Sequence, residues 1–324
     1  MIALVYLVWG PLGPEPLRTF LRSYRERPAG AEHELVVLMN GVSDAQRPQL
    51  LSELGGVEHR VLTLEEPMQD LAAYLRAAQL LEHERLCFLN SYSEILVPDW
   101  LTKLNEALDQ PRVGLVGATG SWASTRSWAL HAYFLPTAYR GVMPPRRVAR
   151  EQFLAIELER DGGFAEHEDD RPPKPASASG VLRASRVAIR GLSELPRQMR
   201  DFEPFPAHHL RTNAFMIAHS TLAKLRLHHV REKADAYVLE SGRNSLTRQV
   251  QRMGLRAVVV DRAGETYDQD QWHRSRTFWQ GSQEGLLVAD NQTRSYERGG
   301  ADRRRLLSAL AWGPCADSHP GSTG

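Results

Sequence analysis

The chain has 324 residues, of which 42% are hydrophobic and 24% charged, so it is long enough for one large α/β domain or two smaller ones. Its 40 Lys and Arg residues nearly balance 39 Asp and Glu residues. The resulting net charge of +1 excludes a chain-wide field that would recruit nucleic acid or an anionic membrane.

Short apolar runs alternate with amphipathic stretches along the first 120 residues. They predict strands at 2–9, 34–39, 57–62, 86–89 and 113–116, and helices at 17–25, 48–54, 71–83 and 99–108. This alternation predicts an α/β fold with a mostly parallel, doubly wound sheet flanked by helices. Because ligands bind beyond the carboxyl ends of such strands, the candidate binding loops begin at Trp9, Asn40, Asn90 and Gly117.

The regular pattern stops after residue 120. We expect an irregular insertion with a mobile loop at 121–210, because this stretch contains an acidic run and several prolines. Order returns with predicted strands at 212–218 and 255–260 and with predicted helices from Thr221, at 244–253 and at 303–312. The expected organisation is therefore a first half (1–120), the insertion, a second half (211–312) and a disordered tail (313–324).

The two cysteines, Cys87 and Cys315, supply neither a disulfide framework nor a thiolate metal site. The apolar start of the chain is too short to span a bilayer and has no basic leader. We therefore expect a cytoplasmic protein without a transmembrane segment. The adjacent histidine pairs at 208–209 and 228–229 lack the i, i+4 spacing of a zinc-binding helix face, so we expect no metal there.

The glycines Gly114, Gly117 and Gly120 have the spacing of a dinucleotide-binding loop. Such a loop normally follows the first strand of its unit, and an acidic residue about 20 positions later binds the ribose. This one follows the fifth predicted strand, and residues 121–150 contain no Asp or Glu. An NADP-binding oxidoreductase that uses Arg140 or Arg146 is the least favoured alternative.

Two loops of the first half resemble those of the family 2 glycosyltransferases of GT-A fold. Residues 39–44 (MNGVSD) stand where the family has an Asp-rich loop that holds the base and ribose. Residues 88–95 (FLNSYSEI) and 98–101 (PDWL) stand where the family holds the diphosphate through a divalent cation. The resemblance covers residues 1–120 and, more loosely, 211–262. It implies a nucleoside diphosphate sugar as donor, a glycan or other hydroxyl as acceptor, and these donor-binding residues: Trp9, Asn40, Asp44, Asn90, Ser91, Tyr92, Glu94 and Arg248.

The family's catalytic aspartates are replaced. Asn90 and Tyr92 stand at their positions, and Glu94 is the remaining carboxylate of the loop. Mg²⁺ and Mn²⁺ prefer carboxylate oxygens and phosphates, so three alternatives stay open. Glu94 takes the metal role, arginines neutralise the diphosphate without a metal, or the site is inactive. Asn90 also fits a turn or cap after a strand.

The segment from Glu240 to Arg248 resembles the family's acidic segment, whose carboxylate deprotonates the acceptor hydroxyl, although its spacing is about one residue longer. Partial burial raises the pKa of a carboxylate and suits it to this role. The resemblance therefore makes Glu240 the candidate base of an inverting sugar transfer. The alternative is that Glu240 only complements a helix dipole.

Aromatic, amide and arginine side chains are dense between residues 271 and 293, which fits an acceptor or diphosphate wall. Its candidates are Trp272, Arg274, Arg276 and Trp279, and the two arginines are also candidates to replace a cation. The two tryptophans equally fit a role in the core. The rival to the transferase hypothesis is a catalytically inactive GT-A-like protein that binds a nucleotide or a glycan.

Overall fold

The computed structural model describes residues 1–126, 196–226 and 233–316. The chain forms two compact units, one of residues 1–123 and 206–324 and the other of residues 124–205. In the second unit, residues 196–201 are helical and the Ser124 hydroxyl donates to the carbonyl of Glu203 at 2.5 Å. Most of the predicted insertion and of the predicted tail lies outside the described residues, and both stay predictions.

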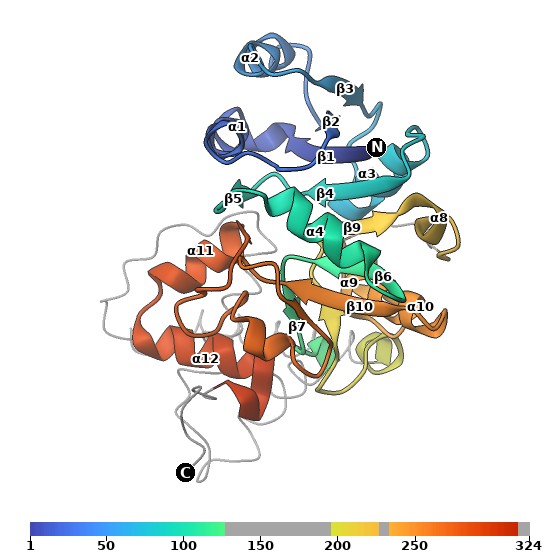
Figure 1. The fold of residues 1–324 in the computed structure, drawn as a ribbon, viewed down its shortest axis with the longest axis vertical. Coiled ribbons are helices and arrows are strands. Elements are labelled where there is room, and N and C mark those ends of the chain that lie inside the picture. Colours follow the sequence, from blue (N-terminus) through green and yellow to red (C-terminus); the bar gives the residue numbers. More distant parts are fainter. Residues whose placement is uncertain (127–195, 227–232, 317–324) are drawn as a thin grey trace, which may run out of the picture. The chain divides into compact units, whose positions relative to one another are not determined.

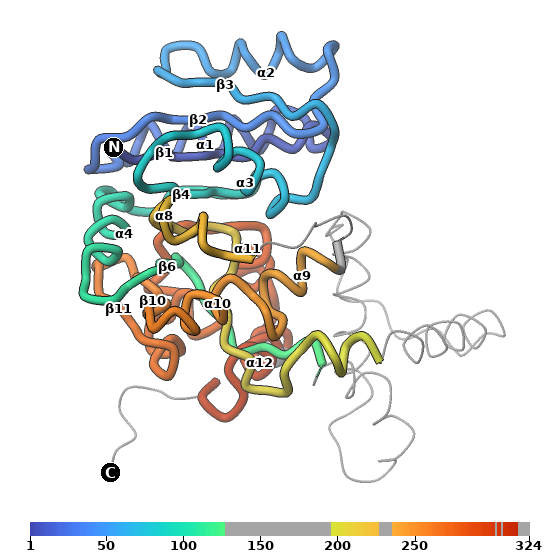
Figure 2. Tube along the Cα trace, turned by 90° about the vertical axis from the view of Figure 1, so that its right-hand side faces the viewer, coloured from blue at the N-terminus to red at the C-terminus, as the bar shows by residue number. Residues whose placement is uncertain are grey.

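An eight-stranded sheet forms the centre of the first unit (Figure 1). Its order is β11-β10-β6-β9-β4-β1-β2-β3, and Figure 2 shows β3, β2, β1 and β4 following one another down the view. The strands are β1 (Ile2–Trp9), β2 (His33–Asn40), β3 (Arg60–Thr63), β4 (Arg85–Leu89), β6 (Val113–Gly117), β9 (Ala214–Ala218), β10 (Arg256–Val260) and β11 (Thr266–Tyr267). Only β9 and β11 pair antiparallel with their neighbours in this sheet. The predicted mostly parallel α/β fold is confirmed.

Helices flank this sheet. They are α1 (Glu15–Glu26), α2 (Arg47–Glu53), α3 (Asp70–Ala78), α4 (Trp100–Asp109), α8 (His219–Leu222), α9 (Lys233–Ser241), α10 (Leu246–Arg252), α11 (Asn291–Arg298) and α12 (Ala301–Trp312). Short 3₁₀ turns lie at Gly10–Leu12, Trp272–Ser275 and Gly313–Cys315. The helix predicted at 71–83 ends at Ala78, and α8 begins at His219, before the predicted start at Thr221.

Two small two-stranded sheets complete the first unit. One pairs β5 (Glu94–Ile95) with β12 (Val288–Ala289), and the other pairs β7 (Gly120–Ser121) with β8 (His209–Leu210). Each joins a segment that follows an early strand to a segment from the second half of the chain. Residues 1–123 and 206–324 therefore form one structural unit, and β8 lies within the range predicted as an insertion.

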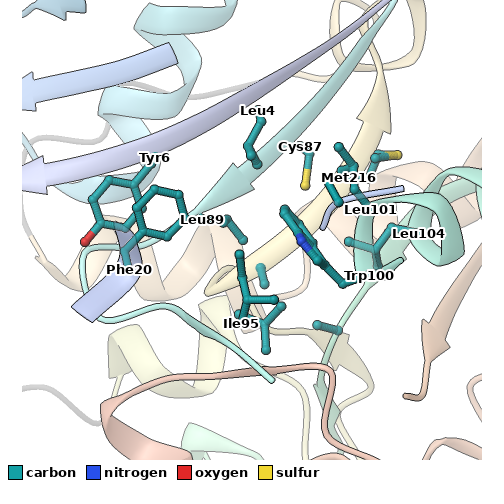
Figure 3. Close-up of a cluster of buried hydrophobic side chains, with 14 of the residues drawn as sticks. Leu4, Tyr6, Phe20, Cys87, Leu89, Ile95, Trp100, Leu101, Leu104 and Met216 are labelled. Carbon is teal, nitrogen blue, oxygen red and sulfur yellow. The ribbon is translucent and has the colours of Figure 1, made fainter. Parts of the chain in front are cut away.

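The strand β1 is buried on both faces, as a central parallel strand requires. On one face Leu4 and Tyr6 join a cluster with side chains of α1 and α4, including Phe20 and Trp100 (Figure 3). The rings of Tyr6 and Phe20 stack with their centroids 3.9 Å apart. The Tyr6 hydroxyl points away from the rest of the labelled cluster in Figure 3 and donates to the carbonyl of Ser91 at 2.8 Å.

The reversed direction of β9 decides which residues share an edge of the sheet. Because β9 runs antiparallel between β4 and β6, the residues that precede it lie at the carboxyl ends of those strands. The Asn90 amide donates to the Asn213 carbonyl at 2.9 Å, and the Arg211 amide donates to the Thr119 carbonyl at 3.1 Å. The sheet thus brings residues 90, 119 and 211–213 together.

The glycine motif after β6 has a packing role. Gly117 and Gly120 end β6 and begin β7, so a second strand follows the first and no helix begins there. A Cβ atom on Gly120 would lie 2.9 Å from the Trp272 side chain, and one on Gly117 would lie 3.0 Å from Leu210. The strand β6 is also remote from the first crossover of the sheet. These observations disfavour the NADP-binding alternative.

Candidate functional site

The sheet changes its winding direction between β1 and β4. From β1 the chain continues outward to β2 and β3, whereas β4 lies on the other side of β1. Open α/β sheets bind ligands in the crevice outside the carboxyl ends of the strands at such a switch point. Here the two strand ends are joined, since the amide of Trp9 donates to the hydroxyl of Ser91 at 3.2 Å.

The ends of β1 and β2 approach each other closely at two glycines. A Cβ atom on Gly10 would lie 2.0 Å from the carbonyl oxygen of Gly41, so only glycine fits. Gly41 has a φ of +65°, and a Cβ atom on it would lie 3.1 Å from the Trp9 ring. The indole of Trp9 is therefore held beside the loop that contains Asp44, whose side chain is exposed.

Asn40 ties the end of β2 to the segment before α3. Its buried side-chain amide donates to the Met68 carbonyl at 2.7 Å and accepts from the Met68 amide at 3.0 Å. This reciprocal pair gives Asn40 a structural role. Its contact with a ribose stays a prediction.

Asn90 forms a turn at the end of β4. Its Oδ1 atom accepts from the Tyr92 amide at 3.0 Å and from the Ser93 hydroxyl at 3.1 Å. This is the turn that an asparagine after a strand favours. The side-chain oxygen at this position is thus occupied by protein donors.

Arg294 binds the next part of the same loop. Its guanidinium donates to Glu94 Oε2 at 3.1 Å and to the Tyr92 carbonyl at 3.0 Å. Burial raises the pKa of the Tyr92 hydroxyl, and Asp70 raises it further. The opposing charge of Arg294 lowers that pKa.

Sequence reasoning missed Arg294. The signal was present, because Asp290 and Thr293 form a capping box that marks the start of α11 and places residue 294 in its first turns.

A cavity of about 250 Å³ lies beside this loop. Such a volume is somewhat below that of pockets for drug-sized ligands. The lining residues come from the start of α1, the loop after β4, and α11: Leu12, Glu15, Pro16, Thr19, Ser91, Tyr92 and Arg294.

Glu240, the candidate base, lies at the same edge of the sheet. From the last turn of α9 its carboxylate accepts from the amide of Thr212 at 3.0 Å. Removal from solvent raises the pKa of Glu240, and the charge of Asp290 raises it further. Arg211 and the hydrogen bond from Thr212 lower that pKa and only partly offset the burial. The structure thus provides a carboxylate that takes up a proton more readily than an ordinary glutamate.

The two tryptophans of the predicted acceptor or diphosphate wall differ in burial. Trp272 is fully buried, in agreement with the core alternative. Trp279 is half-buried, its ring stacks on Phe278, and its Nε1 donates to the Gln292 carbonyl at 3.2 Å. Trp279 therefore packs against the start of α11, and its contact with an acceptor stays a prediction.

Of the three predicted arginines, Arg248 and Arg276 contact residues outside the 90–94 loop. Arg274 is exposed, and Arg276 forms an ion pair with Glu284. Arg248, on α10, donates to Gln251 at 3.4 Å. Their roles as phosphate ligands stay predictions.

A search of residues 1–126, 196–226 and 233–316 finds no group of three or more His, Cys, Asp and Glu side chains that could hold a metal ion. Burial lowers the pKa of His209 to about 4, and its Nδ1 atom lies 2.7 Å from the carbonyl oxygen of Ala207. The pair 228–229 and the acidic run 166–170 lie outside the described residues. Among the helices of the described part, none combines the length and apolarity that a membrane crossing requires.

No family model and no curated protein matches the chain. Solved structures with some similarity include the mannosyltransferase PcManGT from Pyrobaculum calidifontis with GDP-Man and Mn²⁺, at TM-score 0.32 and 14% identity over 61% of this chain and 72% of that one. Another is glucosyl-3-phosphoglycerate synthase from Mycobacterium tuberculosis, at TM-score 0.31 and 17% identity over 61% and 78%. The chain spans about a third of the S. aureus TarS structures it matches, at TM-score 0.30 and 15% identity over 36% of this chain and 34% of that one.

Proposed function

We propose that the protein transfers a sugar from a nucleoside diphosphate sugar to an acceptor hydroxyl, with inversion at the anomeric carbon. The observation that carries the proposal is the position of Glu240. A carboxylate with a raised pKa hydrogen-bonds Thr212, at the edge of the sheet where Asn90 follows β4. A base and a donor crevice at one sheet edge are what a direct displacement needs.

In the proposed reaction the acceptor oxygen attacks the anomeric carbon from the side opposite the diphosphate. The new carbon–oxygen bond forms as the bond to the diphosphate oxygen breaks, and the nucleoside diphosphate leaves. The acceptor proton passes to the Glu240 carboxylate. Its raised pKa favours this transfer because burial makes the protonated form more stable than it is in an ordinary glutamate.

The donor lies across the switch point in this proposal. The base and ribose lie near Trp9 and Asp44, where the first two strands end. The diphosphate lies near Ser91 and Tyr92, which line the cavity beside α1.

One observation favours a second candidate function. Asn90 supplies a neutral oxygen that is already used in a turn, so the loop after β4 lacks the negative charge expected from the resemblance. A protein that binds a nucleotide or glycan without catalysis fits this feature. Such a protein would bind nucleoside diphosphates without consuming any nucleotide sugar.

A release assay on UDP-, GDP-, dTDP- and CDP-linked sugars tests the proposal. We expect the wild type to release nucleoside diphosphate from at least one donor and Glu240→Gln to do so at least about 100-fold more slowly. The variant keeps an oxygen for the Thr212 amide, so the dissociation constant of the nucleoside diphosphate should change by less than about twofold. Asp235→Asn, on the same helix, is the matched control and should keep its turnover. Unchanged turnover in Glu240→Gln would contradict the assignment, and binding without turnover in the wild type would favour the second candidate.

A further inference from the structure

The resemblance to metal-dependent transferases raises the question of whether the 90–94 loop fits a divalent cation. Mg²⁺ and Mn²⁺ prefer several carboxylate or carbonyl oxygens that are free to coordinate. Asn90 Oδ1 accepts two hydrogen bonds from its own loop, and the carbonyl of Ser91 accepts one from Tyr6. The carbonyl of Tyr92 and Oε2 of Glu94 are bound to Arg294. This donor set does not fit a divalent cation.

Arg294 has the surroundings that such a cation would have. Its guanidinium is held by one carboxylate oxygen and one backbone carbonyl oxygen of the loop. Within the described part of the chain these bonds use two of its five N–H groups, which leaves three for a ligand. The side chain also lines the cavity together with Ser91 and Tyr92.

The position of this guanidinium is fixed by three connections. The capping box of Asp290 and Thr293 sets the start of α11, and the Asp290 carboxylate is also bound to Arg211. The strand pair β5–β12 holds Glu94 beside Ala289, immediately before that cap. A positioned guanidinium loses little conformational entropy when it binds a phosphate.

Glu15 is the acidic residue that lines the cavity, and Asp70 acts on the Tyr92 hydroxyl from nearby. The Glu15 carboxylate lies 3.4 Å from Arg18 Nη1 and its side chain is 75% exposed. Solvent and Arg18 therefore reduce its repulsion of an anion. Arg294, at 24% exposure, lies closer to the interior, where charge interactions are stronger.

We propose that Arg294 takes the place of the divalent cation and binds the donor diphosphate, so that nucleotide binding needs no metal. The inference rests on the proposed function, since it names the group that neutralises the diphosphate in that same site. A guanidinium offers paired N–H donors to phosphate oxygens, and its positive charge favours the diphosphate over an uncharged nucleoside. Glu94 then acts as the residue that positions Arg294.

Calorimetry with UDP, GDP, dTDP and CDP, each compared with its nucleoside, tests the inference. The wild type should bind at least one diphosphate equally well in EDTA and in Mn²⁺. Arg294→Gln should weaken that binding by about tenfold or more while leaving the affinity for the nucleoside nearly unchanged. Arg298→Gln, which removes the same charge from the exposed end of α11, is the matched control and should behave as the wild type. Thermal unfolding of each variant checks that it is folded.

Glu94→Gln tests whether the Glu94 carboxylate positions Arg294 or binds a divalent cation. If Glu94 only positions Arg294, this variant binds the diphosphate without metal and to within a few-fold of the wild type. Diphosphate binding that disappears in EDTA, or an Arg294→Gln variant with wild-type affinity, would overturn the inference and leave the transferase proposal standing. Failure of the wild type to bind any of the four diphosphates would overturn the proposed function together with the inference.

Discussion

Arg211 and Asp290 form an ion pair in the interior of the protein. Arg211 Nη2 lies 2.8 Å from Asp290 Oδ2, and the two side chains are 8% and 0% exposed. The guanidinium also lies 4.1 Å from the centre of the Phe278 ring. The pair connects the segment before β9 to the residue that caps α11. It therefore holds together the elements that carry Glu240's partner Thr212 and Arg294.

Removal of one member should leave an uncompensated buried charge. We expect Asp290→Ala to lower the free energy of unfolding by about 3–5 kcal/mol, since it also deletes a helix cap. Asp268→Ala removes a partner of Arg256 from a more exposed pair and should cost about 1 kcal/mol or less. Urea unfolding monitored by circular dichroism measures both. Equal losses for the two variants would contradict a structural role for the Arg211–Asp290 pair.

The raised pKa of Glu240 predicts an effect of pH on stability. Its folded-state pKa lies above its ordinary value of 4.5, so the stability it contributes is present below that value and is lost as pH rises through the folded-state pKa. Glu240→Gln should therefore be more stable than the wild type at neutral pH, and the difference should shrink as pH falls towards 4.5. Turnover requires the ionised base. In a plot of the wild-type turnover rate against pH, the midpoint of the acid limb should therefore lie above pH 4.5. The difference in stability between Glu240→Gln and the wild type is measured at pH 7 and at pH 4.5. A difference that favours the variant less at pH 7 than at pH 4.5 would contradict the prediction.

The hydrogen bonds of Asn40 predict that an aspartate placed at the end of β2 destabilises the protein. Asp has no amide to donate to the Met68 carbonyl and would place a carboxylate oxygen against it. We expect Asn40→Asp and Asn40→Ala each to lower the free energy of unfolding by about 1–3 kcal/mol. Asp44→Asn, on the exposed loop beyond it, should change that energy by less than about 0.5 kcal/mol. A stable Asn40→Asp variant in thermal unfolding would argue against the Met68 contact.

The two tryptophans of the predicted wall should differ in how much stability is lost when each is replaced by alanine. Trp272→Ala removes a fully buried indole and should cost about 3–5 kcal/mol of stability. Gly120→Ala should also destabilise, by about 1–3 kcal/mol, because its methyl group would lie 2.9 Å from the Trp272 and Val259 side chains. Trp279→Ala, at a half-buried position, should cost less than Trp272→Ala. Chemical denaturation of the three variants gives the comparison, and a mild effect of Trp272→Ala would reopen its role as a ligand wall.

The sequence predicts most of the central sheet because its strands are continuous apolar runs bounded by Gly, Pro or Asn. The run 2–9, for example, is β1 to the residue. The two-residue strands β5 and β12 give no such signal, since their pairing depends on segments almost 200 residues apart. The antiparallel direction of β9 is likewise set by the topology and leaves no local pattern in residues 214–218.

The candidate site likewise contains residues that the sequence identifies and residues that it does not. Trp9 and Ser91 are found by their positions after apolar strands, and the structure joins them by a hydrogen bond. The sequence pointed to Arg274 and Arg276 as replacements for a cation because they lie among aromatic residues. In the described part of the chain Arg294 contacts the 90–94 loop, and its helix α11 directly follows β12, the strand that pairs with β5. Burial decides the role of Trp272, and burial of a single side chain has no signature in one sequence.

Hydrogen-exchange mass spectrometry of the wild type, with and without a saturating nucleoside diphosphate chosen from UDP, GDP, dTDP and CDP, tests the central claim most directly. The claim is that the donor occupies the crevice where β1 and β4 diverge. We predict slower exchange in the loops at 10–13, 41–46 and 91–95, which lie at the carboxyl ends of β1, β2 and β4. Protection confined to residues 256–285, or no protection with any of the four nucleotides, would contradict it.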